Sequence, residues 1–143
     1  MNEKIELLLS GCQFRRMLDR EFADIEKRYG LCRIDVQILF YLCSAGDNNT
    51  AGDIVNLGFF TKGHVSQSLS RLKNRKFIRL ERDEQDRRRL RILLEEKTEE
   101  ITRQIQQIED RIDRQVLRGI SEQEMQTFRR IAQKIMENIN SGG

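Results

Sequence analysis

The chain has 143 residues, of which 38% are hydrophobic and 34% charged, and it contains no proline. A chain of this length can bury one hydrophobic core, and without proline it lacks the residue that most often breaks helices. We therefore expect a single, mainly helical domain over residues 1–143. No apolar run reaches the roughly 18 residues that span a bilayer, and the opening MNEKIELLLS does not resemble a signal peptide. We expect a cytoplasmic protein with no membrane partner.

The cysteines and the histidine do not form a metal or disulfide pattern. Cys12, Cys32 and Cys43 are odd in number and show no CxxC spacing, and His64 is the single histidine. Zinc sites need clustered cysteine and histidine ligands, and disulfide frameworks need paired cysteines. There is also no GxSxG motif and no glycine-rich phosphate loop after a strand. We expect reduced thiols, no cofactor, no metal and no enzymatic activity.

The positive charge is concentrated in one segment. Residues 62–91 hold 11 basic and 4 acidic side chains, a surplus of +7, whereas the whole chain carries only +3. A local positive field is typical of a surface that binds phosphate. A basic segment is also often no more than a solvated face, so the surrounding elements must decide between the two.

Apolar periodicity predicts the first two helices. From Ile5 to Tyr29, apolar residues recur at mostly three- and four-residue steps, which is typical of an amphipathic helix. Gly30 can end that helix in the left-handed conformation. A second apolar segment covers residues 34–43 and precedes the turn-forming sequence SAGDNN.

Two short capped helices are expected next. Thr50 and Asp53 form a capping box that opens the first of them, and Gly58 closes it. Thr61 is the expected N-cap of the second. Its core-facing residues are Val65, Leu69 and Leu72, and its outward-facing residues are Lys62, His64, Ser66, Gln67, Ser70 and Arg71.

The apolar period then changes from that of a helix to that of strands. Residues 77–81 and 92–96, FIRLE and ILLEE, flank the charged sequence RDEQDRRRLR of residues 82–91. Three helices followed by a hairpin indicate an α+β winged helix-turn-helix, in which the second helix of the motif enters the DNA major groove. The charged sequence is then the wing.

The polar face of the helix after Thr61 suits DNA. Gln67 can hydrogen-bond adenine, and Lys62 and His64 can donate to guanine. The alternative for His64 is that it is an exposed polar residue that contacts no base. We expect Ser70 to be an exposed polar residue of this kind. The residues that we expect to contact DNA are Thr61, Lys62, Gly63, His64, Ser66, Gln67, Arg71, Lys73, Arg75, Asp86, Arg87 and Arg88. Among these, Arg71, Lys73 and Arg75 are expected to contact phosphate.

The wing mixes acids with arginines. A carboxylate can hold a guanidinium group in fixed geometry through paired hydrogen bonds. Arginines are favoured in narrow, A·T-rich minor grooves, and we expect Arg88, or else Arg87, to enter one. The alternative is that these charges only protect an exposed strand edge.

Residues 61–94, TKGHVSQSLSRLKNRKFIRLERDEQDRRRLRILL, resemble the MarR-type winged helix-turn-helix transcription regulators. They are similar to the recognition helix, the strand entry rLekkGlI and the wing pattern D..DrR of that family. The rest of the chain resembles the family in length and layout. The resemblance implies a two-fold dimer built by the first and last helices, and an acid-x-arginine pair, here Asp86 and Arg88, that holds an arginine in the minor groove. It also implies a small phenolic or lipophilic effector.

The chain departs from this family at two junctions. The family's glycine after the recognition helix is Lys76 here, so the left-handed residue must move to Asn74 or be strained. The family's LTekG after the wing is replaced by residues 94–98, LEEKT, which lack the threonine cap and the glycine.

The last third of the chain predicts two more amphipathic helices. The apolar stripe of the first is Ile101, Ile105, Ile108, Ile112 and Val116, and that of the second, opened by a capping box at 121–124, is Met125, Phe128, Ile131, Ile135 and Ile139. We expect residues 1–30 and 95–143 to be dimerisation helices around a DNA-binding region at 31–94, since a second subunit would cover the stripes. A helical hairpin within a monomer is the alternative.

Together these patterns predict a homodimeric, sequence-selective DNA-binding transcription regulator, a repressor on a palindromic operator. Two alternatives remain. A winged helix can serve only as a protein-interaction module, and Cys12 can make the protein a redox-sensing regulator. Because Cys12 lies on the apolar stripe of the first helix, we expect it to be buried by packing.

Overall fold

The helices and strands follow the apolar pattern and the caps of the sequence. The computed structural model describes residues 2–142. Its elements are α1 (Glu3–Tyr29), α2 (Arg33–Leu42), α3 (Ala51–Asn56), α4 (Lys62–Asn74), β1 (Ile78–Arg82), β2 (Leu90–Leu94), the 3-10 helix η1 (Glu96–Thr98), α5 (Glu99–Arg111), the π-helical turn η2 (Ile112–Val116) and α6 (Glu122–Gly142). The expected mainly α winged helix-turn-helix with flanking helices is confirmed.

The predicted caps define the ends of these helices. Gly30 ends α1 with a φ of 63°, and its N–H donates to the Glu26 carbonyl. Thr50 and Asp53 form the capping box of α3, and the side chain of Thr61 accepts from the His64 N–H at the start of α4. Each cap satisfies backbone groups that a helix end leaves unpaired.

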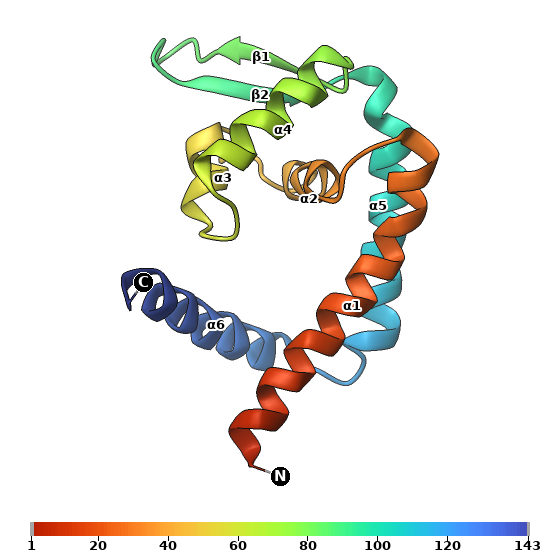
Figure 1. Ribbon diagram of the computed structural model, residues 1–143, viewed down its shortest axis with the longest axis vertical. Coiled ribbons are helices and arrows are strands. Elements are labelled where there is room, and N and C mark those ends of the chain that lie inside the picture. Colours follow the sequence, from red (N-terminus) through yellow and green to blue (C-terminus); the bar gives the residue numbers. More distant parts are fainter. Residues whose placement is uncertain (1, 143) are drawn as a thin grey trace.

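The reader, residues 31–94, lies at one end of the molecule. Figure 1 shows α2, α3, α4 and the β-hairpin grouped there, with α1 and α5 running side by side away from them. The strands are antiparallel, with Ile78 opposite Leu94 and Arg82 opposite Leu90. From the far end of α5 the chain returns as α6, whose Asn140 side chain touches Gly58 in the loop between α3 and α4. The chain therefore forms a ring in which the end of α6 comes back to the reader (Figure 1).

A single core joins the reader to α1 and α5. Val36 and Leu39 of α2 are fully buried, and the same cluster includes Ile25 of α1 and Leu72 of α4. The α5 residues Ile101, Ile105 and Ile108 are buried in it too. The expectation that a second subunit covers this stripe is therefore wrong for its first half, because the stripe packs within its own chain.

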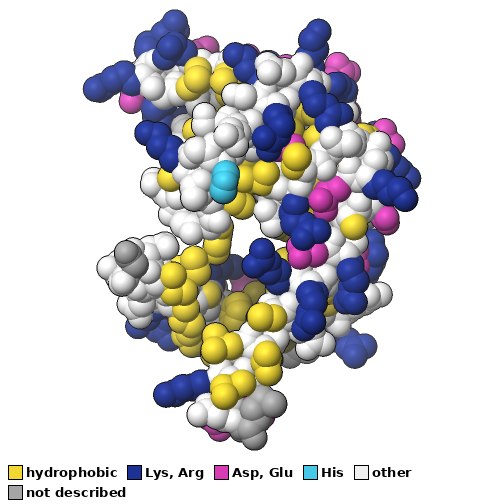
Figure 2. Space-filling model, in the orientation of Figure 1, with side chains coloured by type: hydrophobic (Ala, Val, Ile, Leu, Met, Phe, Trp, Pro, Cys, Tyr) yellow, Lys and Arg dark blue, Asp and Glu magenta, His cyan; other side chains and the backbone are white. Residues whose placement is uncertain are grey.

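Two apolar surfaces remain uncovered in the single chain. The first is the N-terminal half of α1 and the second is one face of α6, which has no buried residue. Their exposed apolar residues are Ile5, Leu7, Leu8, Leu9 and Phe14 on α1, and Phe128, Ile131, Ile135 and Ile139 on α6. Figure 2 shows hydrophobic side chains gathered along α6 and the lower part of α1, beside the opening of the ring.

Cys12 lies in the exposed half of α1. The cysteine is exposed, so the burial that we expected for it does not occur within the chain. Cys32 is exposed as well, whereas Cys43 is partly buried. Burial is the main reason that the pKa of the Cys43 thiol is raised.

Within residues 2–142, no helix is both long and apolar enough to cross a membrane.

The turn from α4 into β1 is made by Lys76. Its φ of 63° is the one positive value outside glycine among residues 2–142, and Asn74 is the last residue of α4. The alternative that placed the left-handed residue at Asn74 is therefore wrong. A left-handed residue with a side chain costs about 1–2 kcal/mol, so Lys76 is strained.

The second departure from the family pattern is compensated locally. The Thr98 hydroxyl donates to the Phe77 carbonyl at 2.6 Å, and the Glu95 N–H donates to the same carbonyl at 2.9 Å. Thr98 is buried. The junction between β2 and α5 is thus tied to the start of the hairpin although the usual threonine cap and glycine are missing.

Candidate nucleic-acid interface

Helix α4 presents one buried and one exposed face. Its buried residues are Val65, Ser68, Leu69 and Leu72. Lys62, Gly63, His64, Ser66 and Gln67, the residues expected to read bases, are all exposed. The structure therefore leaves their side chains and the Gly63 backbone free for a ligand on the outer side of the reader.

Two further residues share this exposed face. The spacing from Gly63 to Gln67 is four residues, from Gln67 to Ser70 three, and from Ser70 to Asn74 four. The four residues therefore lie on one side of the helix. Both are exposed. Ser70 was expected to be a solvated polar residue, and Asn74 was considered only as a helix end. Their helical spacing from Gln67 places them on the exposed face, opposite the buried residues of α4, and this spacing could have identified them from the sequence.

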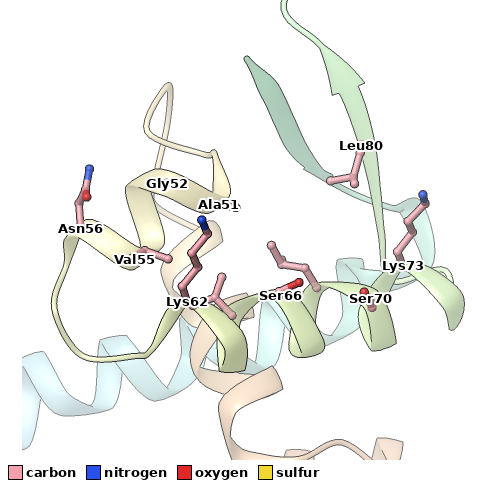
Figure 3. A pocket seen from close by; sticks show the side chains of 11 residues that line it. Ala51, Gly52, Val55, Asn56, Lys62, Ser66, Ser70, Lys73 and Leu80 are labelled. Atoms are coloured by element: carbon pink, nitrogen blue, oxygen red, sulfur yellow. The ribbon is translucent and has the colours of Figure 1, made fainter. Parts of the chain in front are cut away.

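An open groove of about 550 Å³ lies between α3, α4 and β1. Its polar wall comes from α4, with Lys62 and Lys73 near its two ends and Ser66 and Ser70 between them. Figure 3 shows these side chains along α4, with Leu80 of β1 facing them across the groove. Hydroxyl and ammonium groups in one row can donate to phosphate and base acceptors. This side of α4 suits a polyanion.

Arg71 is engaged inside the reader. Asp35 of α2 is only 2% exposed. Its carboxylate accepts from the Ser68 hydroxyl at 2.5 Å and from Arg71 Nη2 at 2.9 Å, and from the Cys32 N–H at 3.2 Å. The buried charge is therefore fully paired. Arg71, expected to contact phosphate, instead fixes α4 on α2.

Arg75 is engaged as well. Its Nη1 donates to the Gly30 carbonyl at 2.7 Å, and its Nη2 donates to the Tyr29 carbonyl. Lys73 differs from the two arginines, because its side chain has no hydrogen bond or ion pair to any residue of 2–142. Of the three cations assigned to phosphate, Lys73 is thus the one that the structure leaves free.

The wing tip presents Arg88. Asp86 Oδ1 accepts from the Arg88 N–H at 3.1 Å and lies 3.6 Å from Arg88 Nε. The Arg88 side chain is 95% exposed. The Arg87 carbonyl accepts from Arg82 Nη1 at 2.9 Å, which braces the loop from inside. The pair that the family resemblance implies is therefore formed, with its guanidinium group in solvent.

Arg89 and Arg91 anchor the wing to the reader. Arg91 Nη1 donates to the Asp47 carbonyl and to Asn49 Oδ1, both at 2.8 Å, and Arg91 Nε lies 3.4 Å from Asp83. Arg89 Nη2 lies 3.8 Å from Asp53 at the start of α3. Acids of the wing and of α3 thus anchor Arg89 and Arg91, whereas Arg87 and Arg88 at the tip are exposed.

The two anchoring carboxylates remain charged at neutral pH. Desolvation raises the pKa of Asp83, but the hydrogen bond and charge of Arg91 outweigh it, and the net pKa is lowered. Desolvation also raises the pKa of Asp53. The hydrogen bonds from Thr50 and the charges of Arg89 and Arg91 outweigh this effect, so the net pKa of Asp53 is lowered. The wing therefore stays anchored over the neutral range.

Within residues 2–142, no group of three or more His, Cys, Asp or Glu side chains is placed to hold a metal ion. The exposed polar side chains of this region lie on α4 and on the wing.

Comparison with known families agrees with this geometry. The model of the MarR family matches residues 29–89, which contain α2, α3, α4, β1 and the wing loop. The reader is a MarR-type winged helix-turn-helix. No curated protein has a significant sequence match to the chain.

Several solved structures share the whole architecture of the chain. The transcriptional regulator PA3341 is 21% identical with a TM-score of 0.75, covering 98% of this chain and 99% of that one. The transcription regulator MarR from Oenococcus oeni PSU-1 is 18% identical with a TM-score of 0.76, covering 95% and 99%. MepR of S. aureus in a complex with DNA is 20% identical with a TM-score of 0.65, covering 97% and 99%. The first two are transcription regulators by description, and the likeness of all three extends to α1, α5 and α6.

Proposed function

We propose that the protein is a sequence-selective DNA-binding transcription regulator that acts as a homodimer on a palindromic operator. The observation that carries this proposal is the pairing of a free polar face on α4 with a wing whose Asp86 holds Arg88 in solvent. Gln67 would read bases in the major groove, and Arg88 would enter the adjacent minor groove. Lys73 would contact phosphate. The S. aureus MepR structure, similar in fold, contains DNA.

The uncovered faces of α1 and α6 support the homodimer. Phe128 of α6 is 63% exposed and Leu8 of α1 is 70% exposed, and both belong to continuous rows of apolar residues. Contiguous apolar patches on a single chain mark interaction sites. A second copy of the chain would bury both rows, and a two-fold axis would place two readers about 34 Å apart on one side of the DNA.

We infer the direction of regulation from occupation of the promoter by the dimer. A dimer bound to a palindrome within a promoter would block it, so we infer repression. A small phenolic or lipophilic effector between the dimer helices and the reader would relieve it by changing the spacing of the two readers. The cytoplasmic location belongs to the same proposal.

Selection of bound sequences from a pool of random duplex DNA tests the proposal. We expect an inverted repeat to be enriched, and affinity for it to fall steeply as salt rises, because phosphate contacts release counterions. A winged helix that serves only to bind proteins would enrich no sequence. That outcome would reject DNA-directed regulation.

A further inference from the structure

Two short segments connect the reader to the helices that flank it. Residues 30–32 join α1 to α2, and residues 95–98, which include η1, join β2 to α5. Both lie at the same end of the paired helices α1 and α5 (Figure 1). Both connections between the reader and the paired helices therefore lie together, in addition to the core that α2 shares with α1 and α5.

Arg75, the C-cap of α4, contacts both connections. Its guanidinium group donates to the carbonyls of Tyr29 and Gly30 at the end of α1. Its own carbonyl accepts from the Lys97 ammonium group in η1. One residue thus ties the end of the recognition helix to the end of α1 and to the start of α5.

The ring of Phe77 packs against the charged groups of both Arg75 and Lys97. The Arg75 Cζ atom lies 5.1 Å from the centre of the Phe77 ring, and Lys97 Nζ lies 4.3 Å from it. Both distances are within the range of cation–π attraction. The Phe77 carbonyl accepts from Thr98 at 2.6 Å. We call Arg75, Phe77 and Lys97 the junction cluster.

The chemistry of the contact requires arginine. The last carbonyls of a helix have no partner within it, and a cation there also interacts favourably with the helix dipole. The planar guanidinium group can donate to two adjacent carbonyls at once, which a lysine ammonium group cannot do in the same fixed geometry. Because Arg75 directly follows α4, the contact allows little movement between α4 and α1.

We propose that Arg75 is a positioning residue that sets the angle of the recognition helix relative to the dimer helices, and hence the spacing between half-sites that the dimer accepts. The inference rests on the proposed function, since half-site spacing has meaning only for a DNA-binding dimer. It replaces the phosphate contact expected for Arg75 from the sequence. A phosphate contact and a positioning role predict opposite results in binding experiments.

The experiment compares Arg75→Ala, Arg75→Lys and Lys73→Ala in the full chain. Each is titrated with the operator selected by the wild type and with operators whose central spacer is one base pair shorter or longer, at two salt concentrations. The wild type should prefer its own spacing by roughly tenfold, the loss typical of one mismatched contact. Both Arg75 variants should lose most of this preference with an unchanged salt dependence. Lys73→Ala should keep the preference and bind with a shallower salt dependence.

Amide hydrogen exchange of the free proteins provides a readout that does not need DNA. In both Arg75 variants, exchange should become faster in residues 29–32 and 95–98, while Leu72 in the core of α4 stays protected. If Arg75→Ala keeps the wild-type spacer preference, or weakens all operators equally with a shallower salt dependence, the positioning role is wrong. Unchanged exchange at the two connections would also overturn it. If the wild type selects no sequence, the proposed function fails, and the exchange data alone decide whether the junction cluster restrains the reader.

Discussion

Asp35 of α2 and Arg71 of α4 are joined by two contacts, Nη2 to Oδ1 at 2.9 Å and Nε to Oδ2 at 3.3 Å. The carboxylate lies in the core, whereas the guanidinium group is 41% exposed at its surface. This pair fixes the recognition helix α4 against α2.

Arg71→Ala should lower the free energy of unfolding by about 2–3 kcal/mol, because it leaves a buried carboxylate with only part of its hydrogen bonds. Urea unfolding at neutral pH measures the loss. Lys73→Ala is the matched control, and this exposed change should stay within about 0.5 kcal/mol of wild type. An Arg71 variant of full stability that binds every duplex more weakly would instead support the phosphate contact expected from the sequence.

Lys76→Gly should raise the free energy of unfolding by about 0.5–1 kcal/mol. Glycine adopts a positive φ without steric cost, and this gain exceeds the entropy that it adds to the unfolded chain. Asn74→Gly, two residues earlier and still helical, should lower stability by about 0.3 kcal/mol. The opposite signs are measured by thermal or urea unfolding, and equal signs would contradict the position of the left-handed turn.

Lowering the pH should weaken the anchoring at Asp53. Because the folded-state pKa of this carboxyl lies below its ordinary value of 3.8, its contribution to stability is present above that value and is lost as the pH falls through the folded-state pKa. The difference in urea midpoint between wild type and Asp53→Asn should therefore be largest near pH 6 and shrink below pH 3.8. A difference that does not change with pH would show that the charge of Asp53 adds nothing.

The sequence predicts those parts of the fold that depend on local order. Each cap occupies neighbouring positions, so Thr50 with Asp53 and Thr61 with His64 can be recognised from spacing alone. The Asp86 and Arg88 pair is also local. By contrast, the partners of Arg71 and Arg75 lie 36 and 45 residues away in the chain. Periodicity predicts which face of a helix is polar, but it does not show which polar residue meets another element.

The same limit explains the apolar stripes. Ile105 of α5 and Ile135 of α6 belong to similar apolar stripes, yet the first is buried in the core of its own chain and the second is 44% exposed. The difference arises because α5 packs against α1 and α2, whereas α6 runs apart from them (Figure 1) and has no buried residue. A stripe indicates that a face needs cover, and the tertiary arrangement decides whether the cover comes from the same chain.

Gln67→Ala should relax sequence preference and cost about 1–3 kcal/mol on the best operator, because a bidentate bond to one base is lost. Competition titrations with the operator and its single-base variants measure this effect. Lys73→Ala should weaken all these duplexes about equally. A Gln67 variant with the wild-type order of preference would remove this residue from base readout.

Asp86→Ala should weaken operator binding although it adds positive charge to the wing. Without the carboxylate, the Arg88 guanidinium must lose more conformational freedom to reach the same position. Random duplex should bind as well as before or slightly better. Arg88→Ala should weaken both and reduce the salt dependence.

The double variant Asp86→Ala/Arg88→Ala should cost less than the sum of the single variants, since the acid acts only through its arginine. Titration of all four proteins at two salt concentrations measures this coupling. Tighter operator binding by Asp86→Ala would show that the wing acts by charge alone.

Sedimentation velocity of the wild-type chain with fluorescent duplexes tests dimeric, sequence-selective binding most directly. The duplexes are the selected palindrome, the same palindrome with one half-site scrambled, and a random sequence of equal length. We predict two chains on each palindrome, with much weaker binding to the scrambled and random duplexes. A stable monomer at micromolar concentration that binds all three duplexes equally would contradict the account.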